Sequence, residues 1–192
     1  MSYLRVAPPD AHTQETFQTI KDTFGFIPDF FQSQTARPDM IEAEVQLLGT
    51  TMVKPGALTR QQKEYIFLAC AGANLNTYCA TAHCEIIRML GIDGPEPEQI
   101  AFDYTATDLP MRFKALLNFG LKLNSKPLVI GPDDIEDLRT FGYSEQEILE
   151  AILVVAIAQY ANIVSLGLGT VPDFDSSKLN FAAAGSKVTS AN

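Results

Sequence analysis

Apolar residues recur every three or four positions along most of the chain, which is the spacing of an amphipathic helix and not the strict alternation of a strand. The first such segment covers residues 11–24, and a turn follows it at Ile27-Pro28. A second amphipathic segment covers residues 40–52. Strand signals are scarce, so the pattern predicts an all-α protein.

Two helix starts carry the capping-box pattern, in which a Ser or Thr N-cap is followed three residues later by Glu or Gln. Thr59 pairs with Gln62, and Ser144 pairs with Glu147. Each box opens an alanine-rich apolar run, "YIFLACAGA" after the first and "ILEAILVVAIA" after the second. The first run is apolar on every side, so we expect its helix at the centre of a bundle.

The segments after the two boxes, residues 59–91 and about 144–169, predict a weak internal repeat of one helical unit. Further helices are expected from residue 77 or 78 to Gly91, over 98–104, over 109–124 and after Pro132. We interpret residues 1–192 as a single domain, a helical bundle. The small, polar tail at 176–192 is expected to be frayed or packed on a partner subunit.

The composition narrows the partners that the protein is expected to have. The chain has 192 residues and a net charge of −9, which argues against nucleic acid and against an anionic membrane surface. Its N-terminus has no apolar targeting segment, and its longest uninterrupted apolar runs are far shorter than the roughly 20 residues of a membrane span. Three cysteines at irregular spacing fit free thiols in a reducing compartment. These features predict a cytoplasmic protein.

The segment "NTYCATAHCE", residues 76–85, concentrates candidate chemistry. On a helix Cys79 and His83 lie one turn apart on the same face. Cys79 also falls in the first helical turn, where the macrodipole favours an anion, so the pattern predicts a stabilised thiolate. The alternative is that Cys79 is a small buried apolar residue and His83 a histidine with an ordinary structural role.

Glu64 opens the long apolar run, where an unpaired buried charge would be costly. If the two helices fold back through the "NLNT" turn, Glu64 comes within about one turn of His83. Carboxylate, imidazole and thiol in a row form the arrangement that activates a nucleophilic cysteine. The alternative is that Glu64 is a helix N-terminal acid favoured by the dipole.

The two other cysteines do not fit a metal or disulfide site. Cys84 follows Cys79 by five residues, which on a helix is about 140° of rotation and about 7.5 Å of rise, so a disulfide would need local unwinding. A zinc site with Cys79 and His83 fails for the same reason, and Cys70 is expected in the core. No metal is therefore expected.

Three segments together resemble the alkyl hydroperoxidase D (AhpD)-like proteins of the carboxymuconolactone decarboxylase superfamily, in particular their peroxidase-related branch. They are "FGFIPDFFQSQTARPDM", "LTRQQKEYIFLACAGANLNTYCATAH" and "FGYSEQEILEAILVVAIAQYANIVSLGLG". The second is similar to the family motif E-x(11)-C-x-x-C-x-x-x-H, which places the acid, the second cysteine and the histidine on Glu64, Cys79 and His83. Tyr78 matches the frequent "YC" pair, but Asn76 stands where redox members have the first cysteine.

The resemblance implies an AhpD-like helical fold that forms a homo-oligomer (dimer, trimer or hexamer). It implies a Cys79 thiolate that reduces a hydroperoxide, with His83 and Glu64 relaying its proton. No haem, flavin or metal cofactor is expected. Because Asn76 prevents the vicinal disulfide, an external thiol reductant or, with distortion, Cys84 would regenerate Cys79. Two alternatives stay open: a decarboxylase or isomerase of a small lactone or keto acid that uses His83 as general acid or base, and a non-catalytic binding scaffold.

Overall fold

The computed structural model describes residues 2–6, 8–179 and 181, and within these residues it contains helices and no strand. The predicted all-α class is therefore confirmed. In chain order the elements are α1 (Ala11–Phe24), α2 (Asp29–Gln32), α3 (Pro38–Leu48), the π-helical η1 (Gly49–Val53), α4 (Arg60–Ala73), α5 (Thr77–Met89), α6 (Pro97–Asp103), η2 (Tyr104–Ala106), α7 (Met111–Ser125), η3 (Pro127–Val129), α8 (Pro132–Thr140), α9 (Glu145–Leu168) and η4 (Ser177–Leu179).

Helix α4 lies at the centre of the fold, as its pattern predicts. It contacts α5, α6, α7 and α9, and every residue from Gln62 to Gly72 is buried. At Gly72 a Cβ atom would come within 1.9 Å of the main-chain oxygen of Ala101, so α6 approaches the α4 backbone more closely than any side chain would allow. Because neighbouring helices surround α4, the run from Tyr65 to Ala73 is apolar on every side.

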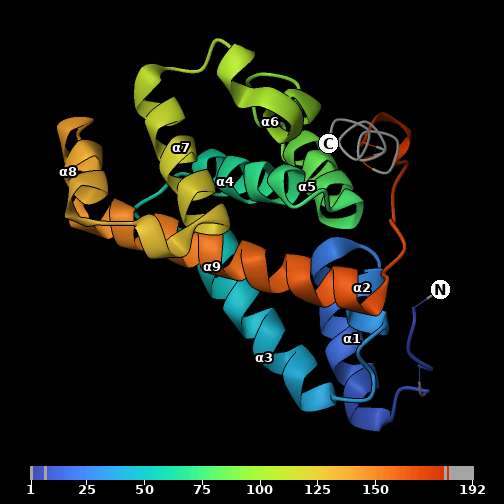
Figure 1. The fold of residues 1–192 in the computed structure, drawn as a ribbon. Coiled ribbons are helices and arrows are strands. Elements are labelled where there is room, and N and C mark those ends of the chain that lie inside the picture. Colours follow the sequence, from blue (N-terminus) through green and yellow to red (C-terminus); the bar gives the residue numbers. More distant parts are fainter. Residues whose placement is uncertain (1, 7, 180, 182–192) are drawn as a thin grey trace.

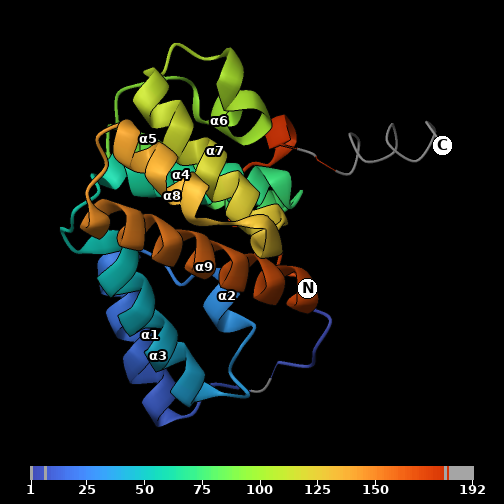
Figure 2. The same cartoon turned by 60° about the vertical axis from the view of Figure 1, so that its left-hand side comes forward.

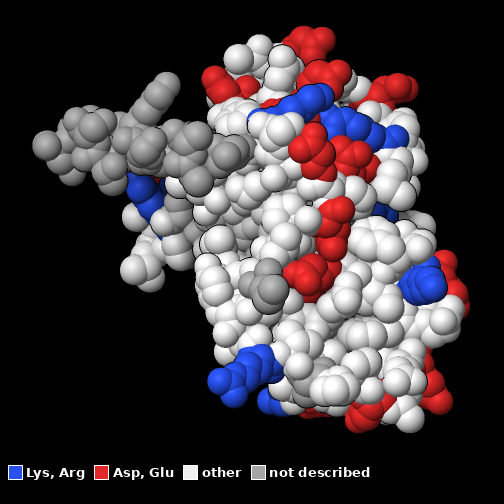
Figure 3. All heavy atoms as spheres, turned by 90° about the vertical axis from the view of Figure 1, so that its right-hand side faces the viewer, with Lys and Arg blue, Asp and Glu red and all other residues white. Residues whose placement is uncertain are grey.

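Helix α9 separates two groups of helices. Figures 1 and 2 both show α1, α2 and α3 on one side of α9, and α4, α5, α6 and α7 on the other. Figure 3 shows one face of the molecule, on which acidic and basic side chains gather at the upper end and further charged side chains lie in the middle and along the lower edge. At one end of the bundle α1, α2 and α3 meet α4 and α5, and a cavity lies between these two groups of helices.

The predicted helix starts agree with the structure where a cap specifies them. The Thr59 hydroxyl accepts from the Gln62 N–H and the Gln62 side chain accepts from the Thr59 N–H, and Ser144 and Glu147 repeat this exchange. Gly91, with φ of 60°, takes the left-handed conformation expected just after α5. Local hydrogen bonding fixes these boundaries whatever the rest of the fold does.

Boundaries without a cap differ from the prediction. Helix α3 begins at Pro38, two residues early, because proline is well suited to the first helical turn. Its predicted last turn is the wider π-helical turn η1. Of the predicted tail, residues 180 and 182–192 lie outside the described part, and Ser177–Leu179 form a 3₁₀ turn with Leu179 buried.

Candidate active site

A short turn brings α5 back along α4. Asn76 caps α5 by accepting the Cys79 N–H at 3.0 Å, and its own N–H donates to the Ala71 main-chain oxygen at 2.9 Å. Leu75, with φ of 54°, takes the left-handed backbone conformation that the tight reversal requires. The turn therefore fixes both the direction of α5 and the placement of Cys79 in its first turn.

The buried carboxylate of Glu64 joins two basic side chains. Its Oε2 lies 2.6 Å from His83 Nδ1, and its Oε1 accepts from Arg60 Nε at 2.6 Å. The Glu64 side chain is 0% exposed. Burial alone raises the pKa of this carboxyl group, but the nearby His83 and Arg60 outweigh burial and hold the pKa below its ordinary value. The predicted contact of Glu64 with His83 is present, and Glu64 is ionised.

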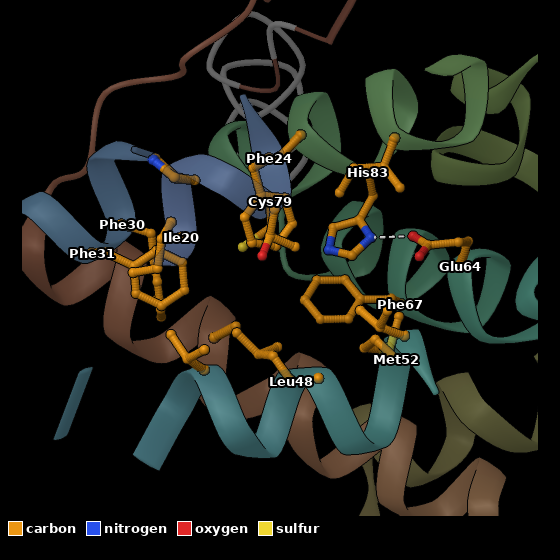
Figure 4. Close-up of a pocket in the computed structure, with 18 of the residues that line it drawn as sticks. Ile20, Phe24, Phe30, Phe31, Leu48, Met52, Glu64, Phe67, Cys79 and His83 are labelled. Atoms are coloured by element: carbon orange, nitrogen blue, oxygen red, sulfur yellow. Dashed lines mark hydrogen bonds and ion pairs between the residues drawn. The ribbon is translucent and has the colours of Figure 1, made fainter. Parts of the chain in front are cut away.

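The His83 ring is held in one orientation. It stacks on Phe67, with ring centroids 3.6 Å apart and planes 20° apart. Because ionised Glu64 only accepts hydrogen bonds, Nδ1 carries a hydrogen and, in the neutral ring, Nε2 has a free lone pair. Figure 4 shows this second nitrogen pointing away from Glu64, toward the side of the cavity on which Cys79 lies. The arrangement presents a base to the cavity.

Cys79 is buried, and its environment differs from the one predicted. The side chain is 4% exposed and its sulfur lies 3.5 Å from the Ser165 hydroxyl, a contact in which either group can donate. Burial raises the pKa of the thiol to about 12, against a smaller lowering by Ser165. The expected stabilised thiolate is therefore wrong, because burial penalises the charged form of the thiol. At neutral pH the thiol is therefore protonated.

Asn76 replaces a possible thiol with a structural amide. Its Nδ2 donates to the Ser165 hydroxyl at 2.7 Å and to the Asn162 main-chain oxygen at 3.2 Å. These bonds tie the start of α5 to α9 beside the Cys79 sulfur. Asn76 therefore positions Ser165 as well as the backbone of Cys79.

Tyr78, a predicted supporting residue, connects α5 to helix α2 and to the segment that follows α9. Its hydroxyl donates to Asp173 Oδ2 at 2.8 Å and accepts the Phe30 N–H at 3.0 Å. Burial, together with the Asp173 carboxylate, raises the pKa of the Tyr78 hydroxyl far above its ordinary value. The tyrosine therefore stays neutral and holds α2, whose Phe30 lines the cavity, against α5.

The cavity has a volume of about 250 Å³ and includes Cys79, His83 and Glu64 among its walls. Helices α1, α2 and α3 and the π-helical turn supply most of the apolar wall. Figure 4 shows Phe30, Phe31 and Ile20 on one side and Glu64 on the other, with Cys79 and His83 between them. A small apolar molecule in the cavity would meet the thiol and the imidazole together.

The remaining cysteines lie away from this cavity. Cys84 is not among the residues that line it, and it lies near Glu98 of α6 and Lys178 of η4, while Cys70 is fully buried in α4. Among the described residues no group of three His, Cys, Asp or Glu side chains is placed to hold a metal ion. The structure therefore assembles Glu64, His83, Cys79, Tyr78 and Asn76 in one place, and it leaves Cys84 out.

Three residues of the site were not predicted. Arg60 has a usable signal, because an arginine four residues before a glutamate on a helix pairs with it. Phe67 and Ser165 have none, since each is one more residue in an apolar helix. Ser165 comes from α9, 86 positions from Cys79.

The sequence matches no family model and no curated protein. Solved structures do match. One is a peroxidase-related protein from Ralstonia eutropha JMP134, described as an alkylhydroperoxidase AhpD core. It is 26% identical to this chain with a TM-score of 0.82, and the match covers 94% of this chain and 95% of the Ralstonia chain. A peroxidase-related protein from Silicibacter sp. TM1040 is 22% identical with a TM-score of 0.81, covering 93% of this chain and 92% of its own.

A third match is a cysteine-to-alanine variant of the debrominase Bmp8 in complex with 2,3,4-tribromopyrrole. It is 16% identical with a TM-score of 0.74, covering 96% of this chain and 99% of its own, and at that identity the likeness shows the fold alone. The Silicibacter structure, at 22% identity, also shows the fold alone, whereas the Ralstonia structure agrees with the family that the sequence resembles. The chain is therefore assigned to the AhpD-like superfamily.

Proposed function

We propose that the protein is a thiol-dependent oxidoreductase that reduces an apolar hydroperoxide at Cys79. The observation that carries the proposal is that the Cys79 sulfur and a His83 ring oriented by buried Glu64 line the same apolar cavity. A nucleophile, a base and a group that orients the base are the parts that such chemistry needs. The assignment to the AhpD-like superfamily supports the proposal at the level of the family.

In the proposed step the Cys79 sulfur attacks the terminal oxygen of the hydroperoxide. A bond forms between the sulfur and this oxygen, and the O–O bond breaks. Cys79 is oxidised to a sulfenic acid and the hydroperoxide is reduced to an alcohol. His83 Nε2 takes the thiol proton and delivers it to the departing alkoxide, so the proton balance closes within the site. Glu64 keeps its charge and stabilises the imidazolium that forms in between.

The high pKa of the thiol decides how this step begins. A thiolate formed before the substrate arrives would be rare at neutral pH, since burial raises the pKa of Cys79 to about 12. The proton must therefore move to His83 as the sulfur attacks, which is general-base catalysis of a neutral thiol. Activity should accordingly depend on His83 more steeply than in a site with a preformed thiolate.

A second thiol must return Cys79 to its reduced state. An external thiol condenses with the sulfenic acid, which releases water and leaves a mixed disulfide, and a second external thiol then releases Cys79. Cys84 lies outside the cavity and is buried toward α6, so it is poorly placed to attack the sulfenic acid. The proposed reductant is therefore a small or protein thiol that reaches the cavity.

The test is consumption of cumene hydroperoxide with dithiothreitol as reductant, in wild type and in the Cys79→Ser variant. We expect the enzymatic rate to vanish in Cys79→Ser and to remain in the matched controls Cys70→Ser and Cys84→Ser. A sulfenic acid on Cys79, trapped with dimedone and located by mass spectrometry, would support the same step. Unchanged turnover in Cys79→Ser would refute the proposal.

One observation favours a second candidate, a decarboxylase or isomerase of a small lactone or keto acid. The Glu64–His83 pair is complete without Cys79 and presents a base to the cavity, whereas the thiol is neutral. In that reaction His83 would move a proton to or from carbon. This candidate predicts activity that is kept in Cys79→Ser, where the hydroperoxidase loses it, whereas both candidates predict a loss of activity in His83→Ala.

A further inference from the structure

We propose that the cavity binds an apolar molecule carrying a carboxylate, and that the Arg60 guanidinium holds this carboxylate. The inference rests on the proposed function for the position of the reacting group, and it names the substrate class of that site. It concerns a residue outside the Glu64, His83 and Cys79 set. Its basis is the hydrogen bonding of Arg60, the charge balance around Glu64 and the distribution of apolar residues along the cavity.

Arg60 uses only part of its hydrogen-bonding capacity. Its Nε donates to Glu64 Oε1 at 2.6 Å, and within the described part of the chain its two terminal nitrogens form no hydrogen bond. A guanidinium has five N–H groups in a planar fork, which suits a carboxylate bound through both oxygens. The side chain lines the cavity and is 30% exposed, so a ligand can reach it.

The charges around Glu64 would balance with one more anion once His83 is protonated. Both Glu64 oxygens are taken, one by Arg60 and one by His83, so a single carboxylate serves two basic groups. When His83 gains a proton in the reaction, the cluster carries a net positive charge. A ligand carboxylate beside Arg60 would balance it, and in a partly desolvated cavity this local effect outweighs the protein's distant net charge of −9.

The neighbouring basic residue is not available for this role. Lys63 is buried, and its ammonium group contacts Glu150 Oε1 at 2.6 Å and the Lys54 main-chain oxygen at 3.1 Å. Lys63 is also absent from the residues that line the cavity, among which Arg60 is the guanidinium that contacts Glu64. The anion-binding capacity of this end of the cavity therefore comes from Arg60.

The rest of the cavity sets the shape of the ligand. Figure 4 shows Phe30, Phe31 and Ile20 on the side opposite Glu64, with Cys79 between them and His83. A carboxylate at Arg60 and an apolar tail against Phe30 and Phe31 would place the middle of the molecule beside the sulfur. The substrate class is therefore a small apolar acid with its hydroperoxide on an internal carbon, several bonds from the carboxylate.

The test compares octanoate with octan-1-ol, which share a chain length and differ in the head group. Isothermal titration at pH 7.5 measures both ligands on wild type, on Arg60→Gln and on Arg60→Lys. We expect wild type to bind octanoate at least about 10-fold more tightly than octan-1-ol. Arg60→Gln should remove this preference and leave the affinity for octan-1-ol unchanged, and Arg60→Lys should reduce it because an ammonium group cannot form the fork.

Equal affinity for the two ligands in wild type, a preference that survives in Arg60→Gln, or no binding of octanoate would each overturn the proposal. If Arg60→Gln fails to fold, as judged by circular dichroism, Arg60→Lys decides, and a full preference in that variant also overturns it. Neither ligand contains an O–O bond, so the titrations do not involve the chemistry of Cys79. Failure of the hydroperoxidase proposal would therefore appear in the turnover assay and not in these affinities.

Discussion

Helices α4 and α9 both follow a capping box and are both rich in alanine and large apolar residues, yet only α4 is enclosed. In α4 every residue from Gln62 to Gly72 is buried. In α9 four large apolar side chains are at least half exposed: Leu149, Leu153, Ile163 and Leu166. The fifth position after each cap shows the contrast most clearly, because it is the buried carboxylate Glu64 in α4 and the exposed Leu149 in α9.

The difference teaches that composition along a helix does not determine what surrounds it. By length and composition alone α9 is long and apolar enough to cross a membrane, a criterion that core helices of soluble proteins also meet. In the structure 44% of the 18-residue window that meets it is buried. Helix α9 packs against α4, α5, α7 and the π-helical turn η1. The sequence analysis finds no membrane-span candidate because it counts uninterrupted apolar residues, and the polar residues Gln159 and Asn162 interrupt that run. The helix itself continues through both residues.

The largest expected effect comes from removing the buried carboxylate of α4. Glu64→Ala leaves Arg60 and His83 without their shared partner, and breaking a buried ion pair from one side costs about 3 kcal/mol or more of unfolding free energy. Leu149→Ala at the matching position of α9 should cost less than about 1 kcal/mol because the side chain is exposed. Urea unfolding at pH 7 measures both variants. Similar losses in the two would show that the surroundings of α4 and α9 do not differ as described.

A matched pair of glycines makes the same comparison at the backbone. In Gly72→Ala the new methyl group would meet the Ala101 main-chain oxygen, so α6 must move and we expect a loss of about 1–3 kcal/mol. In Gly167→Ala on α9 no atom lies within 4 Å of the new Cβ. There the gain in helix propensity should stabilise the protein by about 0.5–1 kcal/mol. Effects of the same sign in the two variants would contradict the assignment of close packing to α4 alone.

The parts of the site that were predictable depend on short-range interactions. Thr59 and Ser144 cap their helices through bonds to residues three positions away, and the short turn before Asn76 forces α4 and α5 together, so the contact of Glu64 with His83 follows. Ser165 reaches Cys79 from another helix, and no local pattern encodes that approach. The raised pKa of Cys79 is equally hidden from the local pattern, since it follows from burial of the thiol in the folded protein.

The exposed face of α9 bears on the expected homo-oligomer. Leu149, Leu153 and Ile163 share one side of the helix at helical spacing, which is the pattern that two packed helices bury. If a second copy covers this face, Leu153→Lys combined with Ile163→Lys should shift the protein to monomers while changing monomer stability by less than about 0.5 kcal/mol. Sedimentation velocity measures the mass. A wild type that is monomeric at high concentration, or an oligomer that survives both lysines, would exclude this face as the interface.

The smallest effects concern two buried carboxyl groups with opposite responses to pH. Glu64, in α4, has its pKa lowered by His83 and Arg60 despite burial, so its contribution to stability is complete above its ordinary pKa and is lost as the pH falls through the folded-state value. Glu44 accepts from Tyr160 of α9 at 2.6 Å and from Gln34 at 2.8 Å, but burial raises its pKa. Its contribution is therefore present at low pH and is lost as the pH rises through the folded-state value.

Substituting each group by glutamine should separate the two slopes. Relative to wild type, Glu64→Gln should lose less unfolding free energy between pH 6 and pH 3, because the group that destabilises the fold on protonation is gone. Glu44→Gln should lose more over the same range, because the group that stabilises the fold on protonation is gone. Urea unfolding of both variants at pH 3, 4, 5 and 6 provides the comparison. A change of slope in the same direction for both would mean that Glu44 is stabilised as an anion like Glu64, and that its contact with Tyr160 outweighs burial.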